Sequence, residues 1–199
     1  MRQPEIQSTR LRDFGQVWVP WEPDRAFEDE RLARAVSEFE PVPCPAGWAA
    51  ARWLKEDALA NHGLTMTYVV LLNMRVEGFY SMCAGEIVVS TRHRRAYGFR
   101  HPRQGVALLV WLAKSESARL SGKELLAHAF VRARFAARIQ GLAGIALDPF
   151  DEETASVWRA EPYEFLKSET KLPHGAKRLW RPLGDPELST IAARSGTSP

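Results

Sequence analysis

The sequence predicts a mixed α/β fold in which helices cover one central sheet. Two segments with helical spacing come first, three β-rich stretches follow, and the last third alternates strand-like and helical runs. The chain has 199 residues, of which 45% are hydrophobic and 26% charged, so it is long enough for one domain with a sizeable core. We expect an N-terminal arm over residues 1–27, a domain over 28–183 and a flexible tail over 184–199, where glycine, proline and serine accumulate.

The first half of the domain combines helices with β-rich runs. Helices are expected over 28–38 and 47–61, the second with Trp48, Trp53, Leu54 and Ala58 toward the core. Strands are expected over 67–72 and over 76–90, the latter as a strand pair or one long bent strand. The arginine-rich stretch 91–104 is expected to be a loop.

The second half alternates strands with helices. The apolar run 106–113 predicts a strand buried on both faces, and a helix is expected over 122–139. A short strand over 144–147 and a helix from Glu152 to about Ala160, capped by Asp151, follow. A last strand is expected over 177–183.

Composition excludes several classes of protein. No apolar run reaches the roughly 18 residues of a membrane span, and the N-terminus has no signal-peptide pattern. The two cysteines are too few for a disulfide framework, and the five histidines lack metal-ligand spacing. We therefore expect a cytoplasmic, reduced protein without a membrane partner or a metal site.

The positive charge is concentrated in the middle of the chain. Residues 90–140 contain 11 Lys/Arg and 2 Asp/Glu, whereas the whole chain has a net charge of only +3. Five of these residues come from one short stretch: Arg92, Arg94, Arg95, Arg100 and Arg103. Arginine with interleaved aromatic residues suits nucleic acid, and we expect these five to bind it, although a solvated surface loop is the alternative.

The junction between the strand at 106–113 and the next helix predicts an anion site. A strand that leads into a helix N-terminus through a short polar loop presents free backbone N–H groups, which favour phosphate. Arg119 and Lys123 would add positive charge at this point. An ordinary strand-to-helix junction is the structural alternative.

The order and spacing of several short segments resemble one family. They are the junction Arg119-x-x-Gly122-x-Glu124, the runs Trp53-Leu54-Lys55, Thr67–Val70 and Gly78–Gly85, the acids Asp148 and Asp151-Glu152, and Arg178–Leu183. In this order the chain resembles GNAT-fold acyltransferases, and more specifically the bacterial toxins of toxin–antitoxin modules that acetylate aminoacyl-tRNA. The resemblance runs from about Phe39 to Leu183 and implies a mostly antiparallel sheet with a splayed strand pair and helices on both faces.

The resemblance also implies a co-substrate, acetyl-CoA, and the residues that bind it. Acetyl-CoA would insert between the splayed strands and be held by two groups of residues: Leu112, Ala113 and Lys114 on the strand, and Arg119, Leu120, Ser121, Gly122, Lys123 and Glu124 at the helix. Transfer RNA, an acidic antitoxin and a second copy of the chain are the partners that the resemblance implies.

Two positions depart from the pattern of the family. The third position of the acetyl-CoA motif, usually glycine or alanine, is Glu124, whose carboxylate would repel a diphosphate. The position of the catalytic tyrosine is Trp158, and an indole N–H is not a usable general acid. Tyr163, five residues later, is the alternative acid if the chain turns back after the helix, or else a packed aromatic residue.

Two functions from different classes therefore remain. The first is an N-acetyltransferase that moves acetyl from acetyl-CoA to an amine, in particular the α-amine of an aminoacyl-tRNA. The second is a GNAT scaffold without catalytic activity that binds nucleic acid or protein, as Glu124 and Trp158 suggest. An acetyltransferase for small amines is a third option, which the basic stretch disfavours.

Overall fold

The computed structural model describes residues 16–161, 163–173 and 175–183. The predicted tail 184–199 and the first 15 residues of the predicted arm lie outside these ranges. The strands are β1 (Val17–Pro20), β2 (Met66–Leu72), β3 (Arg75–Val88), β4 (Arg103–Lys114), β5 (Gly144–Leu147), β6 (Leu166–Lys171) and β7 (Lys177–Pro182). The helices are α1 (Pro23–Glu28), α2 (Glu30–Ser37), α3 (Pro45–Arg52) with the π-helical turn η1 (Trp53–Asp57), α4 (Thr91–Ala96), α5 (Gly122–Gln140) and α6 (Glu152–Arg159).

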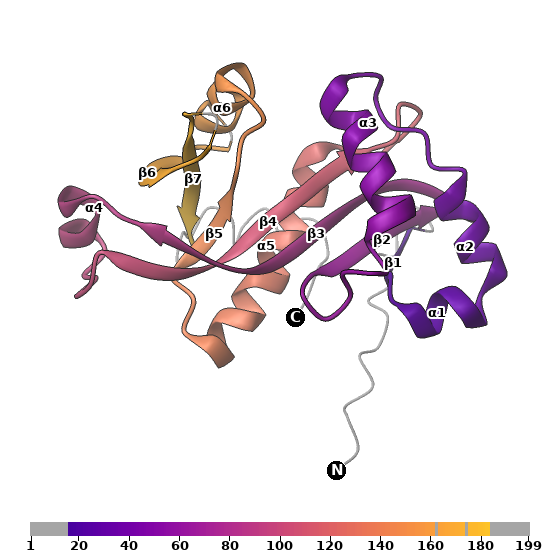
Figure 1. Ribbon diagram of the computed structural model, residues 1–199, viewed down its shortest axis with the longest axis horizontal. Helices are drawn as coiled ribbons and strands as arrows, with labels where there is room; N and C mark the ends of the chain where they lie inside the picture. Colours follow the sequence, from indigo (N-terminus) through magenta and orange to yellow (C-terminus); the bar gives the residue numbers. More distant parts are fainter. Residues whose placement is uncertain (1–15, 162, 174, 184–199) are drawn as a thin grey trace, which may run out of the picture.

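The seven strands form one sheet in the order β1-β2-β3-β4-β5-β7-β6, with helices on both faces. All neighbouring strands are antiparallel except β4 and β5, which are parallel. One core lies between the sheet and α5, and a second lies beneath α2, α3 and η1 (Figure 1). The predicted mixed, mostly antiparallel sheet between two helical layers is confirmed.

The sheet splays between β4 and β5. The two strands pair only from Val106 to Leu109 on β4, opposite Gly144 to Leu147 on β5. A register shift follows at once, because Met82 faces Leu109 whereas Ser81 faces Trp111, which leaves Val110 as an extra residue on β4. In Figure 1 the arm of β5, β7 and β6 diverges from the far half of β4. The far half of β4 therefore has a strand partner only on its β3 side.

This divergence corrects the prediction that the strand at 106–113 is buried on both faces. Val110 is 40% exposed, and Trp111 and Leu112 are only partly buried. The apolar side chains of this run lie beside the splay, where the second neighbouring strand is missing.

The described part of the predicted N-terminal arm contains strand β1 and most of helix α1. Strand β1 pairs with β2, and Trp18 on it is buried against α5. The N–H of Trp21 donates to the carbonyl of Thr67 on the β2 side. Because backbone N–H positions alternate between the two edges of a strand, the nitrogen of Pro20 faces the open edge. A proline at that place removes a donor and protects the edge from further strand pairing.

Three further predictions for the elements need correction. Residues 91–96 form helix α4 rather than loop, because the Ser90 hydroxyl caps it by accepting the N–H of His93 at 3.2 Å. Trp48 is 59% exposed instead of facing the core. Strand β6 was not predicted, since its sequence is polar. For the segment expected over 76–90, the alternative of one long strand is confirmed by β3.

A buried aromatic cluster joins α5 to the sheet. The hydroxyl of Tyr80 and Nδ1 of His128 share a hydrogen bond of 2.6 Å, and the Trp18 ring stacks on His128 at 3.8 Å. Burial lowers the pKa of His128 to about 3, and the nearby charge of Arg132 contributes to this shift. His128 is therefore a neutral core residue at physiological pH.

His128 should make the stability of the protein depend on pH. Its pKa is lowered from 6.5 to about 3, so between these values the unfolded chain binds a proton that the folded chain does not. Stability should thus fall as pH decreases through this window, by up to about 1.4 kcal/mol per pH unit. Urea unfolding at several pH values measures this slope, which should be smaller in His128→Gln. His101→Gln, at an exposed histidine far from this cluster, is the matched control for the loss of an imidazole.

Candidate functional site

The N-terminus of α5 is the centre of the candidate site. Ser121 caps this helix, and its hydroxyl accepts the N–H of Glu124 at 3.3 Å. Among the described residues, the backbone N–H groups of Leu120, Gly122 and Lys123 have no hydrogen-bond partner. The side chains of Arg119 and Lys123 are exposed beside them. Free N–H groups, the helix dipole and two cations form a site that suits phosphate oxygens.

Glu124 is the one member of the predicted set that opposes an anion. Its carboxylate turns back onto the helix end, where Oε2 accepts the N–H of Ser121 at 2.7 Å and its hydroxyl at 2.8 Å. This capping box stabilises α5 but consumes one N–H and adds a negative charge at the anion site. The carboxylate therefore competes with any phosphate group that approaches this end of α5.

The β4 end of the predicted site is only partly open. Leu112, Ala113 and Lys114 pair with β3 on one edge, at Tyr80, Phe79 and Gly78. On the other edge, the Lys114 carbonyl already accepts the N–H of Val42 at 3.1 Å, and Pro41 bridges Ser115. The open edge of β4 thus extends from Val110 to Ala113.

The two alternative catalytic residues, Trp158 and Tyr163, lie together at the C-terminal end of α6. The rings of Trp158 and Tyr163 are 4.9 Å apart, because the chain turns back when α6 ends at Arg159. The hydroxyl of Tyr163 lies 3.8 Å from the position that a Cβ on Gly122 would take. The turn is held by the buried Arg181, whose Nη1 donates to the Tyr163 carbonyl at 2.6 Å. The structure thus brings a phenol, rather than the indole alone, to the N-terminus of α5.

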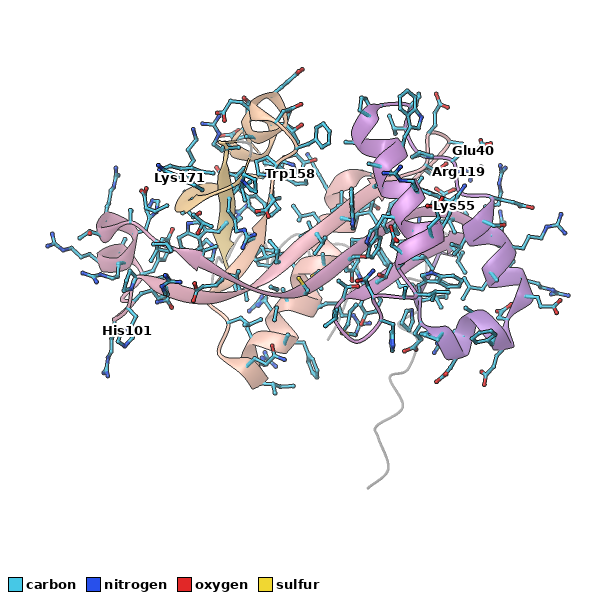
Figure 2. The ribbon with its side chains drawn as sticks, viewed as in Figure 1. Glu40, Lys55, His101, Arg119, Trp158 and Lys171 are labelled. Carbon is cyan, nitrogen blue, oxygen red and sulfur yellow. The ribbon has the colours of Figure 1, made fainter. Side chains whose placement is uncertain are left out.

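Trp158 and Arg119 come from opposite sides of the splay, Arg119 from the loop after β4 and Trp158 from the helix after β5 (Figure 2). Trp158 also packs edge-on against Phe165, at 5.6 Å. It is a partly buried residue at the border of the core. Trp158 therefore serves as the support against which Tyr163 packs.

The five predicted nucleic-acid residues gather at the far end of the β3–β4 hairpin. Arg92, Arg94 and Arg95 lie on α4, which Figure 1 shows at the opposite end of the molecule from α1 and α2. Arg100 and Arg103 follow, and Arg103 pairs with Glu86 at 2.6 Å. The hairpin is anchored by Trp180, whose ring contacts three aromatic rings within 5.4–6.1 Å, those of His93, Tyr97 and Phe99.

The sequence did not indicate that β6 would extend this basic surface. The hydroxyl of Thr170 accepts the N–H of Val88 at 2.8 Å, so β6 lies beside the end of β3. This places Lys171, labelled in Figure 2, on the same side as α4. No ion pair of Lys171 occurs within the described ranges. The sequence could not predict this proximity because β6 is distant from α4 along the chain.

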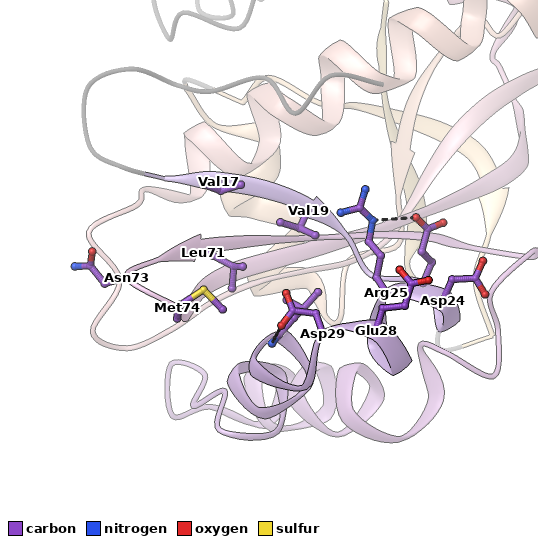
Figure 3. Close-up of a pocket in the computed structure, with 11 residues that line it drawn as sticks. Val17, Val19, Asp24, Arg25, Glu28, Asp29, Leu71, Asn73 and Met74 are labelled. Carbon is purple, nitrogen blue, oxygen red and sulfur yellow. Dashed lines mark hydrogen bonds and ion pairs between the residues drawn. The ribbon is translucent and has the colours of Figure 1, made fainter. Parts of the chain in front are cut away.

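A separate groove lies elsewhere on the molecule. It has a volume of about 990 Å³ and lies between β1, β2, α1 and α2 (Figure 3). Val17, Val19 and Leu71 are among its apolar lining, and Asp24 and Glu28 are on its acidic side. None of the residues predicted as site residues lines it. The part of the chain that the structure describes contains no candidate membrane-spanning helix.

Comparison with known proteins identifies the fold. No protein-family profile matches the sequence, and no curated protein is significantly similar to it. Solved toxin structures match at a TM-score of 0.63 for a Tyr-to-Phe mutant of KacT, with 16% identity over 87% of this chain and 98% of that chain. AtaT complexed with acetyl-methionyl-tRNAfMet matches at 0.62, with 17% identity over 78% and 91% of the two chains. A Tyr-to-Phe mutant of AtaT bound to the C-terminus of the antitoxin AtaR and acetyl-CoA matches at 0.58, with 15% identity over 79% and 90%.

At these low identities, the structural similarity shows a shared fold. The predicted GNAT-like fold of the toxins is therefore confirmed, with its mostly antiparallel sheet and helices on both faces.

The competition between Glu124 and an anion can be measured directly. Glu124→Ala should raise the affinity for inorganic pyrophosphate about fivefold, because a negative charge leaves the helix end and the N–H of Ser121 is released. The same change should lower stability by about 1 kcal/mol through loss of the cap. Calorimetric titration and urea unfolding measure the two effects. Glu116→Ala removes an equal charge from the loop just before α5, where the structure shows no side-chain hydrogen bond or ion pair of Glu116 with a described residue. An equal gain there would contradict the interpretation.

Proposed function

We propose that this protein is an acetyl-CoA-dependent N-acetyltransferase of the toxin type, and that its acceptor is the α-amine of an aminoacyl-tRNA. The observation that carries the proposal is the N-terminus of α5 beside the splay, with three free N–H groups, Arg119 and Lys123, and the hydroxyl of Tyr163 within reach of Gly122. The shared fold with KacT and AtaT supports it. Acetylation of that amine would block translation.

The residues present fit acetyl-CoA in all but one respect. Its diphosphate would be held by the N–H groups of Leu120, Gly122 and Lys123, and its pantetheine arm by the open edge of β4 from Val110 to Ala113. Glu124 opposes the diphosphate and is expected to weaken the affinity. Acetyl-CoA would supply an activated acetyl group.

Tyr163 is the candidate general acid in this reaction. Its hydroxyl lies beside Gly122, at the diphosphate end of the site, so this role requires the side chain to turn toward the thioester end at the open edge of β4. The neutral amine attacks the thioester carbonyl, the new C–N bond forms as the C–S bond breaks, and the leaving thiolate takes the phenol proton of Tyr163. The proton that the amine loses restores the phenol through solvent. Trp158 contributes by packing under Tyr163 at 4.9 Å rather than by proton transfer.

The position of the basic surface favours a long acceptor over a small amine. Lys114 and Arg103 mark the two ends of β4, which are about 35 Å apart at the rise of a strand. A small amine bound near α5 would not reach α4, whereas a transfer RNA is long enough to contact both. An acidic antitoxin is the other polyanionic partner that this surface suits.

The second candidate is a GNAT scaffold that binds nucleic acid or protein without catalysis. It is favoured by the carboxylate of Glu124 on the N–H of Ser121. The thermal melt of the wild-type protein separates the two functions. Acetyl-CoA at millimolar concentration should raise the melting temperature if the protein is an acetyltransferase, and radiolabelled acetyl should appear on aminoacyl-tRNA. A melt that acetyl-CoA leaves unchanged would exclude the enzyme.

Tyr163→Phe should lower kcat about a hundredfold or more, because a general acid contributes at least that factor. The KM for acetyl-CoA should change little, since the ring and its packing remain. Trp158→Phe preserves an aromatic support and should keep kcat within about threefold. Steady-state kinetics with labelled acetyl-CoA measures both, and equal activity in all three proteins would contradict the role of Tyr163.

The role of α4 predicts a salt-dependent affinity for RNA. Arg95→Glu should weaken binding of transfer RNA about fivefold at moderate salt and reduce the dependence on salt concentration, because one phosphate contact is lost. Arg31→Glu reverses an equally exposed charge on α2, at the other end of the molecule, and is the matched control. Filter binding at several salt concentrations measures both variants. Equal losses would mean that net charge, not the α4 surface, determines binding.

A further inference from the structure

Glu77 is a buried acid that no motif in the sequence indicates. It lies on β3 with only 7% of its surface exposed. Its Oε2 accepts the backbone N–H of Arg119 at 2.6 Å, and its own carbonyl accepts the N–H of Ser115 at 2.7 Å. One residue of the sheet thus holds both ends of the loop Ser115–Arg119, which connects β4 to the anion site.

The rest of the loop has weaker or more local support. The N–H of Ala118 donates to the Ser115 carbonyl at 3.2 Å, and that of Glu116 to the Glu40 carbonyl at 3.4 Å. Arg119 is the last residue before the free N–H groups begin at Leu120. The bond from Glu77 therefore determines the orientation of the peptide that leads into those donors.

Gly78, the neighbour of Glu77, explains why this part of β3 lies so close to α5. A Cβ on Gly78 would lie 2.9 Å from the Ala113 carbonyl and 3.0 Å from Cδ1 of Leu125. Only glycine lets β3, β4 and α5 approach this closely, so the preceding residue of β3, Glu77, lies next to the loop that leads into α5.

The charge of Glu77 is unsuited to an electrostatic role, because a carboxylate near a diphosphate is repulsive. The length of the Glu77 side chain suits a structural role, because its oxygen reaches from β3 to the N–H of Arg119. A small polar cavity of about 50 Å³, lined by Glu77, Arg75, Ser115 and Ser117 among others, lies beside this carboxylate. A glutamine amide can therefore replace it, with its oxygen accepting the same N–H.

We propose that Glu77 is the positioning residue of the anion-binding loop. It holds the loop so that the N–H groups of Leu120, Gly122 and Lys123 converge on one diphosphate. This inference rests on the proposed function, because it assigns Glu77 to the acetyl-CoA site. Glu77 acts through the backbone of Arg119 and contacts no substrate.

Three variants test the proposal: Glu77→Ala, Glu77→Gln and the control Glu40→Ala. Glu77→Ala should raise the KM for acetyl-CoA about tenfold with kcat and the KM for the acceptor nearly unchanged, because the loop loses a strong, buried hydrogen bond. Glu77→Gln should restore the wild-type KM. Glu40→Ala removes an exposed carboxylate near the same loop but leaves its backbone bond to Glu116, and should have no effect.

Hydrogen exchange of the protein without ligand separates this proposal from the proposed function. The peptide covering residues 115–121 should exchange faster in Glu77→Ala than in the wild type, and at the wild-type rate in Glu77→Gln. If the wild type neither binds nor uses acetyl-CoA, the proposed function fails, and this exchange pattern alone then tests whether Glu77 orders the loop. Unchanged exchange and KM in Glu77→Ala, or a loss in Glu77→Gln as large as in Glu77→Ala, would overturn the proposal.

Discussion

The structure depends on the point at which β4 loses β5 as its neighbour. Pairing ends at Leu109, and the extra residue Val110 follows immediately. The bulge between β3 and β4 increases the local twist of β4. Beyond it β4 no longer pairs with β5, and the arm of β5, β7 and β6 is directed away. The open edge of β4, the exposed N-terminus of α5 and the position of α6 all follow from this divergence, since each would be covered if the sheet continued flat.

The N-terminus of α5 balances opposing charges within a few residues. Free N–H groups, Arg119 and Lys123 attract an anion, while Glu124 and Glu77 bring two carboxylates to the same region. Both carboxylates make bonds that order the backbone, one by capping α5 and the other by holding the loop. The local order of this site therefore comes from groups that weaken its electrostatic attraction, which is the reason why geometry and affinity have to be measured separately.

The sequence predicted those features that depend on local chemistry. The cap at Asp151, the helix from Gly122 and the strand-to-helix junction follow from neighbouring residues alone. The features that were missed depend on distant contacts. Strand β6 is polar and pairs only because β7 lies beside it, and Glu77 meets a loop 42 residues further along the chain. The helix at 91–96 was missed because its dense arginines resemble a solvated loop, although Ser90 provides a cap.

The concentration of positive charge also has a different meaning once the chain is folded. In sequence, the arginines over 92–103 and the pair Arg119 and Lys123 belong to one basic block. In the structure, the length of β4 separates them by about 35 Å, because one group lies at each end of that strand. A single small anion cannot neutralise both groups. The block therefore comprises two sites with different ligand sizes, a compact anion site on α5 and a broad surface on α4, and only a long polyanion carrying a reactive end would use them together.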